Sequence, residues 1–569
     1  MRYLALAVDY DGTAARNDRL SNDAQRAVER LRISGRRIVL VTGRRLDDLL
    51  RVCPAVALFD VVVAENGAVV YDPRRHEEIV LGAPVPRHLV DRLRERGVAP
   101  VEVGKVLVAT RDPYGPMMFE TIRELGLELH VIANRSAVMA LPPGINKASG
   151  VEFALHRLGL SRHEAVAIGD AENDHSLLMQ CECGVAVANA APALKEVAAF
   201  VTRGANGSGV AELIDEIVAD DLHRMEGKIE RNLVHVGVRS GGTPVRIPPY
   251  GRNVLIAGPS GSGKTTVTTA LVERLIDKTY QVCIVDPEGD YGALPRVVPI
   301  GNRRRAPSVN EILSILEDPA VNLSVNLLGV PLEDRPAFFS QLIPSLVALR
   351  ARTGRPHWVV LDEAHHMLPQ TWRHAESTLP PKFGETILVT VHPDYLTPPI
   401  LSLIDVAFAV GHSPDQTLGA FARTTGRRLT WPQDLAYEPG KIVAWIVGEQ
   451  GEPFSMKAQS PRAERLRHLR KYAEGNLGYH SFYFRGPDCR HNLRAQNLAI
   501  FSQIAEGIDE ETWMFHLRSH HYSQWFRQSI KDSRLADEME RIEQRTDITP
   551  QQTRDLVRAL IGARYTLPA

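Results

Sequence analysis

The chain has 569 residues and a formal net charge of −1, with 44% hydrophobic and 24% charged residues. At roughly 150 residues per domain, this length predicts about four folding units. The near-neutral charge argues against a protein built mainly to coat nucleic acid. Five cysteines are too few for a disulfide framework, and the sequence has neither a signal-peptide pattern nor an apolar run of roughly 20 residues. We therefore expect a cytoplasmic protein without a membrane partner.

The first expected element is a strand over 3–8, which leads into Asp9 and Asp11, two acids with one residue between them. A helix over 21–35 and a second buried strand over 36–44 follow, and this order predicts a parallel sheet. Ligands of such sheets lie at the carboxyl ends of the strands. Two like charges at such an end repel each other, and a cation is the natural partner to offset that repulsion.

Further polar residues stand at predicted strand ends and helix starts, namely Thr42, Lys147, Asp170, Asn173 and Asp174. A carboxylate nucleophile can attack phosphorus and form an aspartyl-phosphate. Mg²⁺ held by one or two carboxylates would neutralise the clustered acids, and a hydroxyl and an ammonium would hold the phosphoryl oxygens. The set therefore indicates a phosphate site with a bound Mg²⁺. The alternative is that these acids only cap helices and turns.

The segments "DYDGT", "VTGR", "NKASG" and "GDAENDHSLL" match, in order, the four motifs of haloacid-dehalogenase-type phosphatases, and residues 1–215 resemble that family. The resemblance implies Asp9 as the nucleophile and Asp11 as the general acid/base. The phosphate-binding residues that it implies are Thr42, Lys147 and Asn173. The Mg²⁺ ligands that it implies are Asp9, Asp11 (through its backbone carbonyl), Asp170 and Asp174.

Residues 83–140 mix a helix with strands and look like the small α/β cap of the Cof-like branch of this superfamily, so the core is expected at 1–82 and 141–215. Such a cap closes over a small phosphate ester and excludes water. The candidates for substrate specificity, none of them assigned a catalytic role, are Arg44, Arg45, Glu65, Asn66 and Arg135.

A second α/β domain is expected over 228–475. Residues 258–265, "GPSGSGKT", fit the phosphate-binding G-x-x-x-x-G-K-T loop between an apolar strand and an amphipathic helix. Backbone N–H groups of such a loop cradle phosphates at a helix N-terminus. The predicted ATP-binding residues are Gly258, Gly261, Gly263, Lys264, Thr265 and Thr266, and Thr265 is also a predicted Mg²⁺ ligand.

Two acids at predicted strand ends are candidates for the second Mg²⁺ ligand of this domain, Asp286 and Asp362. We favour Asp362, because its strand is more apolar and because Glu363 beside it can position water as a hydrolytic ATPase requires. The segments "GPSGSGKTT", "VDPEGDY" and "VVLDEAHHMLP" resemble the HerA–FtsK clan of ring-forming ATPases. That resemblance implies ATP hydrolysis and is compatible with a homo-oligomer through this domain. Thr390 and His392 stand where relatives usually carry a Thr-Gln sensor.

A basic linker helix is expected over 460–475 and a helical module over 476–569, where His516 and His520 are more readily explained by core packing than by a metal site. The predicted fold class is therefore α/β, with a Rossmann-like phosphatase core and an α/β cap, then a P-loop domain, then an α-helical tail.

The predicted function is Mg²⁺-dependent hydrolysis of a small phosphorylated metabolite, such as a sugar phosphate or a phosphoglycolate-like acid, by a chain that also binds and hydrolyses ATP. Two alternatives stay open: a nucleic-acid end-processing kinase-phosphatase, and a DNA-translocating ATPase with a passenger phosphatase. The cap would obstruct a polymer, and Glu363 favours water over a hydroxyl acceptor. Nucleic acid is therefore the less favoured partner.

Overall fold

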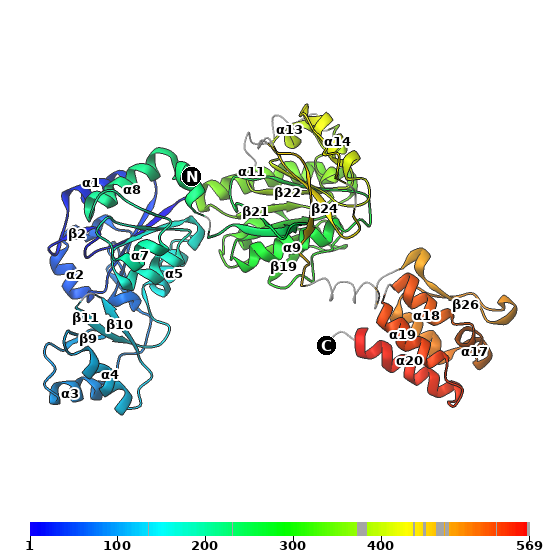
Figure 1. Cartoon of the computed structure of the whole chain (residues 1–569), viewed down its shortest axis with the longest axis horizontal. Coiled ribbons are helices and arrows are strands. Elements are labelled where there is room, and N and C mark those ends of the chain that lie inside the picture. The colour runs from blue at the N-terminus through cyan, green and yellow to red at the C-terminus, as the bar shows by residue number, and fades with distance from the viewer. Residues whose placement is uncertain are drawn as a thin grey trace. The chain divides into compact units, whose positions relative to one another are not determined.

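The computed structural model describes residues 1–134, 136–229, 231–371, 384–435, 438–447, 451–462, 472, 477–530 and 532–565. Figure 1 shows its ribbon. The contacts divide the chain into two compact units, Met1–Gly292 with Arg296–Gln459, and Ala293–Pro295 with Ser460–Ala569. Within the described residues, no helix is both long enough and apolar enough to cross a bilayer. Arg135 and most of the predicted linker helix over 460–475 lie outside the described residues.

The N-terminal domain, residues 1–229, is built on an eight-stranded sheet with the order β14-β13-β12-β1-β4-β5-β6-β7. Strand β1 (Ala5–Asp9) lies between β12 (Ala165–Gly169) and β4 (Arg37–Val41) and is parallel to both. All five residues of β1 are buried, as a parallel sheet covered on both faces requires. The remaining strands are β5 (Val61–Ala64), β6 (Val69–Asp72), β7 (Glu77–Val80), β13 (Cys183–Ala186) and β14 (Phe200–Val201), with a separate hairpin of β2 (Ala15–Arg16) and β3 (Arg19–Leu20).

Helices cover both faces of this sheet. Right-handed crossovers on the two sides of β1 place α1 and α2 on one face and α5, α6 and α7 on the other, and α8 packs against α1 (Figure 1). The Ser21 hydroxyl caps α1 by accepting from the Ala24 N–H at 3.1 Å. The bounds are α1 (Asn22–Ile33), α2 (Leu46–Val52), α5 (Lys147–Arg157), α6 (His175–Gln180), α7 (Pro192–Val197) and α8 (Gly207–Asp220).

A smaller layer is inserted between β7 and α5. Its antiparallel sheet has the order β10-β11-β9-β8, and two helices pack against it through a separate apolar cluster. We call this insertion the cap. Its elements are α3 (Arg87–Glu95), β8 (Glu102–Val103), β9 (Val108–Arg111), α4 (Gly115–Glu124), β10 (His130–Asn134) and β11 (Ala137–Leu141).

The P-loop domain, residues 231–459, is built on an eleven-stranded sheet with the order β16-β15-β25-β24-β23-β17-β22-β21-β18-β20-β19. The seven strands from β23 to β19 are parallel, and the others are antiparallel. The strands are β15 (Val234–Arg239), β16 (Pro244–Ile247), β17 (Val254–Ala257), β18 (Val282–Asp286), β19 (Val297–Ile300), β20 (Asn322–Asn326), β21 (Trp358–Leu361), β22 (Thr386–Thr390), β23 (Val406–Ala409), β24 (Ile442–Ile446) and β25 (Phe454–Ala458). The helices are α9 (Lys264–Asp277), α10 (Val309–Leu316), α11 (Arg335–Thr353), α13 (Pro398–Leu401) and α14 (Pro414–Thr425).

The C-terminal unit is mainly helical and has its own aromatic-rich core. It also holds an antiparallel hairpin of β26 (Phe482–Phe484) and β27 (Leu493–Ala495), which the sequence did not predict. Its described helices are α16 (Leu498–Gly507), α17 (Glu510–Arg518), α18 (His521–Trp525), α19 (Ser533–Glu543) and α20 (Pro550–Tyr565). His516 accepts from backbone N–H groups while His520 lies 2.9 Å from Glu543, so the two histidines have separate partners.

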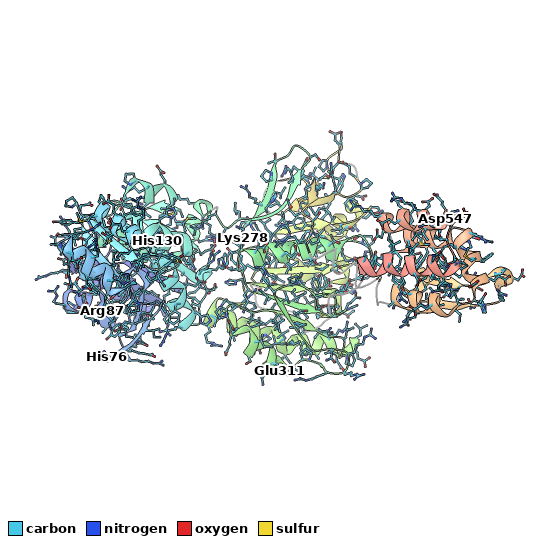
Figure 2. All side chains as sticks on the ribbon, turned by 90° about the horizontal axis from the view of Figure 1, so that it is seen from below. His76, Arg87, His130, Lys278, Glu311 and Asp547 are labelled. Carbon is cyan, nitrogen blue, oxygen red and sulfur yellow. The ribbon has the colours of Figure 1, made fainter. Side chains whose placement is uncertain are left out.

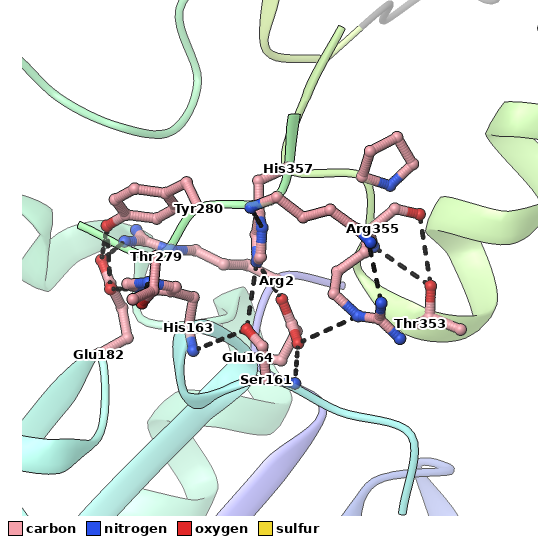
Figure 3. Close-up of polar contacts among 12 residues, drawn as sticks. Arg2, Ser161, His163, Glu164, Glu182, Thr279, Tyr280, Thr353, Arg355 and His357 are labelled. Atoms are coloured by element: carbon pink, nitrogen blue, oxygen red, sulfur yellow. Dashed lines mark hydrogen bonds and ion pairs between the residues drawn. The ribbon is translucent and has the colours of Figure 1, made fainter. Parts of the chain in front are cut away.

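A buried polar contact joins the N-terminal and P-loop domains (Figure 3). His357 Nε2 lies 2.5 Å from Glu164 Oε1, and Arg355 donates to the Gly159 carbonyl at 2.7 Å. The side chains of Glu164, His357 and Arg355 are each at most 1% exposed. Glu164 directly precedes β12 and His357 directly precedes β21, so the contact joins the amino ends of strands from the two sheets.

A second cluster of the same contact surrounds Glu182. Its carboxylate lies 2.7 Å from His163 Nδ1, and it accepts from Arg2 at 2.9 Å and from the Tyr280 hydroxyl at 3.0 Å. Burial disfavours the ionised form, but these partners hold the pKa of Glu182 at about 2. His163 Nε2 also lies 2.8 Å from the Lys278 carbonyl oxygen, just beyond α9. Both polar clusters therefore lie at the strand ends opposite the predicted sites.

Candidate active sites

The first site forms where β1 ends. Lys147, the first residue of α5, donates to Asp9 Oδ1 at 2.6 Å and to Asp174 Oδ1 at 2.5 Å. All three side chains are buried. Burial and the nearby Asp174 carboxylate raise the pKa of Asp9 well above its usual value. Burial opposes the charged form of Lys147 as well, but the two carboxylates outweigh it and raise the pKa of that ammonium.

Asp170 completes an acidic triad with Asp9 and Asp174. One carboxylate oxygen from each of the three lies within 4.8 Å of the others, and no other described His, Cys, Asp or Glu residues form such a group. Asp170 follows β12, and its side chain accepts from the Thr13 hydroxyl at 3.1 Å. Asp174 Oδ2 accepts from the N–H groups of Asp170 and Ala171, both at 3.0 Å. The triad offers hard oxygen ligands at one point, which fits a Mg²⁺ ion.

The Asp11 side chain is turned away from this triad and toward Arg44. Its carboxylate accepts from Arg44 Nε at 2.8 Å and Nη2 at 2.7 Å, a bidentate pair. Arg44 also pairs with Asp18 and, at 2.9 Å, with Asp48. Thr42 is fully buried after β4, where its hydroxyl accepts from the Arg44 N–H at 3.1 Å.

The cap is attached to the site region through Glu65, which the sequence marked only as a candidate for specificity. Its buried carboxylate accepts from the N–H groups of Lys105 at 2.8 Å, Val106 at 3.0 Å and Leu107 at 3.3 Å. These residues lie between β8 and β9, so Glu65 anchors the cap to the core. Asn66, the next residue, accepts from Asn173 at 3.0 Å and thereby positions a predicted phosphate ligand.

The second site forms where β17 leads into α9. Gly258 approaches the β23 side of the sheet so closely that a Cβ there would lie 1.9 Å from the Val410 carbonyl oxygen, and only glycine fits. Gly263, with a φ of 102°, caps α9, and Gly261 has a φ of 75°. Lys264 is buried and donates to the Pro259 carbonyl at 3.2 Å. The half-buried Thr265 and Thr266 follow in the first turn of α9.

Asp362 and Glu363 follow β21, two strands away from β17 in the sheet. Burial, then the negative charges of Glu363 and Asp286, raise the pKa of Asp362 to about 8. Burial also raises the pKa of Glu363, against the nearby Lys264 ammonium. Such crowding of acids beside the predicted phosphate-binding lysine fits a bound divalent cation.

Asp286, the competing candidate, is occupied by its own loop. Its carboxylate accepts from the N–H groups of Gly289 at 2.8 Å, Asp290 at 3.0 Å and Tyr291 at 2.8 Å. These bonds hold the "DPEGDY" turn after β18. Thr390 ends β22, and its hydroxyl lies 3.2 Å from His365 Nδ1, so a Thr–His contact occupies the strand end where a Thr-Gln pair is usual.

Comparison with known proteins identifies the class of both domains. The family model "haloacid dehalogenase-like hydrolase" matches residues 6–96 and 103–214, and the model "AAA ATPase domain" matches residues 244–380. The phosphoglycolate phosphatase of Methanothermobacter thermautotrophicus is 31% identical over 218 residues, which cover 37% of this chain and 96% of that protein. The phosphoglycolate phosphatase of Archaeoglobus fulgidus is 32% identical over 214 residues, covering 37% of this chain and 95% of that protein.

A crystal structure of a haloacid dehalogenase-like hydrolase from Bacteroides thetaiotaomicron is also similar, with 21% identity, a TM-score of 0.34, and coverage of 38% of this chain and 99% of its own. From the relatives above 30% identity, the chain belongs to the haloacid dehalogenase-like hydrolases. It is a phosphatase-like hydrolase that carries an ATPase domain, and the predicted fold class is confirmed.

Sequence reasoning missed two kinds of residue. Thr13, the last residue of the "DYDGT" segment, orients Asp170, and its place in the motif was the available signal. Glu164 and His357, which join the two domains, stand in ordinary positions before strands, and no local pattern marks them.

Proposed function

We propose that the N-terminal domain, called the phosphatase domain from here on, hydrolyses a small phosphomonoester. The observation that carries this proposal is the convergence of Asp9, Lys147, Asp170 and Asp174 from three separate segments on one point. Because both of these relatives are phosphoglycolate phosphatases, phosphoglycolate is the first substrate to test. A cap anchored beside the site supports a small ester over a polymer.

Asp9 is the proposed nucleophile, because its carboxylate is held by Lys147 at the end of β1. Its oxygen would attack phosphorus as the ester P–O bond breaks, giving an aspartyl-phosphate that water then cleaves. Thr42, Lys147 and Asn173 would hold the phosphoryl oxygens. The carboxylates of Asp9, Asp170 and Asp174, with the Asp11 backbone carbonyl, would bind Mg²⁺, whose charge would stabilise the phosphoryl oxygens.

Asp11 is proposed to give a proton to the leaving alcohol and to take one from the attacking water. Its present bidentate pair with Arg44 points it elsewhere. Acid/base action therefore requires a rotation of the Asp11 side chain away from Arg44, and we propose that closure of the cap over substrate drives it. Arg45, which donates to the Val103 carbonyl of the cap at 3.4 Å, would take part in the same movement.

The test is a turnover screen over phosphorylated metabolites, with Asp9→Asn as the blank. The matched control is Asp23→Asn, the same chemical change at an exposed helix position. We expect loss of about 10³-fold or more in Asp9→Asn and unchanged turnover in Asp23→Asn. Equal turnover in the two variants would refute the assignment of the nucleophile.

For the P-loop domain we propose ATP hydrolysis of the HerA–FtsK type, with Lys264 on the β- and γ-phosphates, Thr265 and Asp362 holding Mg²⁺, and Glu363 positioning water. The φ of 41° at Glu363 turns the chain sharply after β21, which supports a dedicated position for this carboxylate. Lys264→Ala should abolish ATP hydrolysis, whereas Lys457→Ala, on the exposed side of β25, should not.

The same assay separates the alternatives. Transfer of label from ATP to a 5′-hydroxyl oligonucleotide would indicate a kinase-phosphatase. Stimulation of ATP hydrolysis by DNA would indicate a translocase. We expect neither, because no contact described above favours a polymer substrate.

A further inference from the structure

A basic hollow lies on the P-loop domain beside its junction with the phosphatase domain. It has a volume of about 460 Å³, and Figure 2 labels Lys278 at this junction. Its charged and polar lining comes from the segment before β15, from the β15–β16 hairpin and from the end of α9. We call it the basic pocket, and these residues are Arg231, His235, Arg246, Arg274, Asp277 and Lys278.

The positive charges of the basic pocket exceed the negative charge available to them. Asp277, which pairs with Arg296, is the one carboxylate among the described lining residues, against three arginines and a lysine. Arg246 is exposed and has no hydrogen bond or ion pair from its side chain to any described residue. Arg231 donates to backbone carbonyls, such as that of Leu178 at 3.2 Å, and no carboxylate of the described residues pairs with it.

The charged form of Lys278 is disfavoured in this pocket. Burial lowers the pKa of Lys278, and the charges of Arg162, Arg231 and Arg246 lower it further, against the single opposing charge of Glu182. A group of cations that repel one another in this way is stabilised by an added anion.

Another arginine-rich hollow, near α1, shows the contrast. Its volume is about 650 Å³, and three of its four lining arginines pair with carboxylates of the fold. Arg37 and Arg74 both pair with Asp60, at 3.1 and 3.0 Å, and Arg36 pairs with Asp221 at 3.1 Å. Most of the positive charge of that hollow is therefore paired, whereas Arg246 of the basic pocket has no side-chain partner within the described residues.

His235 supplies an oriented hydrogen-bond donor. Gln459 Oε1 accepts from Arg274 at 3.2 Å, which fixes the amide so that its Nε2 donates to His235 Nδ1 at 3.2 Å. The hydrogen of the imidazole then resides on Nε2. That atom is covered from solvent and has no partner within the described residues, so a ligand reaches it only after the His235 side chain moves. An unmet buried donor is costly, and a ligand that accepts from it would remove that cost.

Hydrogen bonds at the end of α9 also reduce its repulsion of an anion. The C-terminus of a helix carries partial negative charge, which would repel one. Here the Lys278 carbonyl accepts from Arg162 at 3.3 Å and lies 2.8 Å from His163 Nε2. These contacts from the phosphatase domain cover the carbonyl and leave the cationic side chains facing the pocket.

We propose that the basic pocket binds a small molecule with two or more phosphate groups, at a site separate from the P-loop and from the acidic triad. The volume falls within the range of roughly 300–1,000 Å³ typical of small-molecule sites. Planar guanidinium groups match phosphate oxygens in pairs. A net chain charge of −1 and a pocket built from one short segment, one hairpin and one helix end favour a compact ligand over an extended nucleic acid.

The experiment is calorimetric titration of the full chain with pyrophosphate in EDTA, so that the acidic triad has no divalent cation to attract it. The variants are Arg246→Ala and Lys278→Ala. Arg87→Ala, an exposed arginine on α3, is the charge-matched control. In both pocket variants we expect the chain to bind one pyrophosphate fewer, or to bind it with an affinity lower by about tenfold or more. The control should bind pyrophosphate as the unmodified chain does.

Binding that is equal in all four proteins, or absent in the unmodified chain, would overturn the proposal. A parallel titration uses a single-stranded oligonucleotide in place of pyrophosphate. If the oligonucleotide binds far more tightly than pyrophosphate and loses affinity in Arg246→Ala, the pocket is a nucleic-acid contact and the small-ligand proposal is wrong. Because the Arg246 side chain has no partner within the described part of the chain, its removal should leave folding intact, which circular dichroism checks.

Discussion

His357 of the P-loop domain lies 2.5 Å from Glu164 of the phosphatase domain, and both side chains are covered from solvent. Removing one partner of a buried pair typically costs about 3–5 kcal/mol, because the other is left uncompensated. We therefore expect His357→Leu to lower the midpoint of thermal unfolding measured by calorimetry. Arg26→Ala, which breaks an exposed pair with Asp23, should change stability by less than about 1 kcal/mol. Equal midpoints for the two variants would contradict a stabilising role for this contact.

Lys147 is predicted to be needed for both charge balance and catalysis. Lys147→Met leaves Asp9 and Asp174 buried without the ammonium that bridges them. We expect phosphatase turnover to fall by about 10²-fold or more. We also expect Mg²⁺ to raise the melting temperature of the variant more than that of the unmodified chain, since the cation then replaces the missing charge. Thermal melts with Mg²⁺ and with EDTA measure this, and an equal Mg²⁺ effect in both proteins would count against it.

Glu65 is predicted to control the cap. Glu65→Gln removes the charge that three backbone N–H groups of the cap share. Loss of about 1.5 kcal/mol from a charge-assisted bond corresponds to roughly a tenfold decrease in kcat/KM. ATP hydrolysis should be unchanged. The control is Glu95→Gln, the same change on an exposed face of the cap, and an equal kcat/KM in the two variants would show that Glu65 does not control closure.

The C-terminal unit is predicted to lose stability in mild acid. His516 Nε2 accepts from the N–H groups of Arg485 at 3.0 Å and Gly486 at 3.2 Å. Burial, then His521, lowers the pKa of His516 to about 4. Because the unfolded chain takes up the proton first, near pH 6.5, the stabilisation is complete above that pH and decreases as the pH falls toward 4.

At pH 5 the loss should be about 2 kcal/mol. Hydrogen exchange of the full chain, followed by mass spectrometry, should show faster opening of α17 at pH 5 than at pH 7 after correction for the intrinsic rates. His516→Gln keeps an acceptor but does not titrate, so its protection should not depend on pH in this range. A pH effect of the same size in His516→Gln would assign the sensitivity to another group.

The sequence predicted the positions of site residues that directly follow the strands of the parallel sheet. Asp9 and Asp170 follow neighbouring parallel strands, so their proximity was predictable without coordinates. The direction of the Asp11 side chain was not, because it depends on Arg44, a residue 33 positions away. Hydrophobicity favoured Asp362 over Asp286 as a predicted Mg²⁺ ligand. The backbone N–H groups that donate to the Asp286 carboxylate have no signature in the sequence. The β26–β27 hairpin was missed because aromatic residues there suit a strand or a helical core equally.

Helix α9 connects the P-loop to the contact with the phosphatase domain. Its 14 residues span about 21 Å, from the phosphate loop at one end to a carbonyl held by Arg162 and His163 at the other. Expressing residues 1–229 and the rest of the chain as two separate proteins would expose, in each of them, the polar side chains that are buried at the contact between the two domains. The two enzymes are therefore expected to be inherited and produced as one polypeptide, and separate expression of either half should give a less soluble protein.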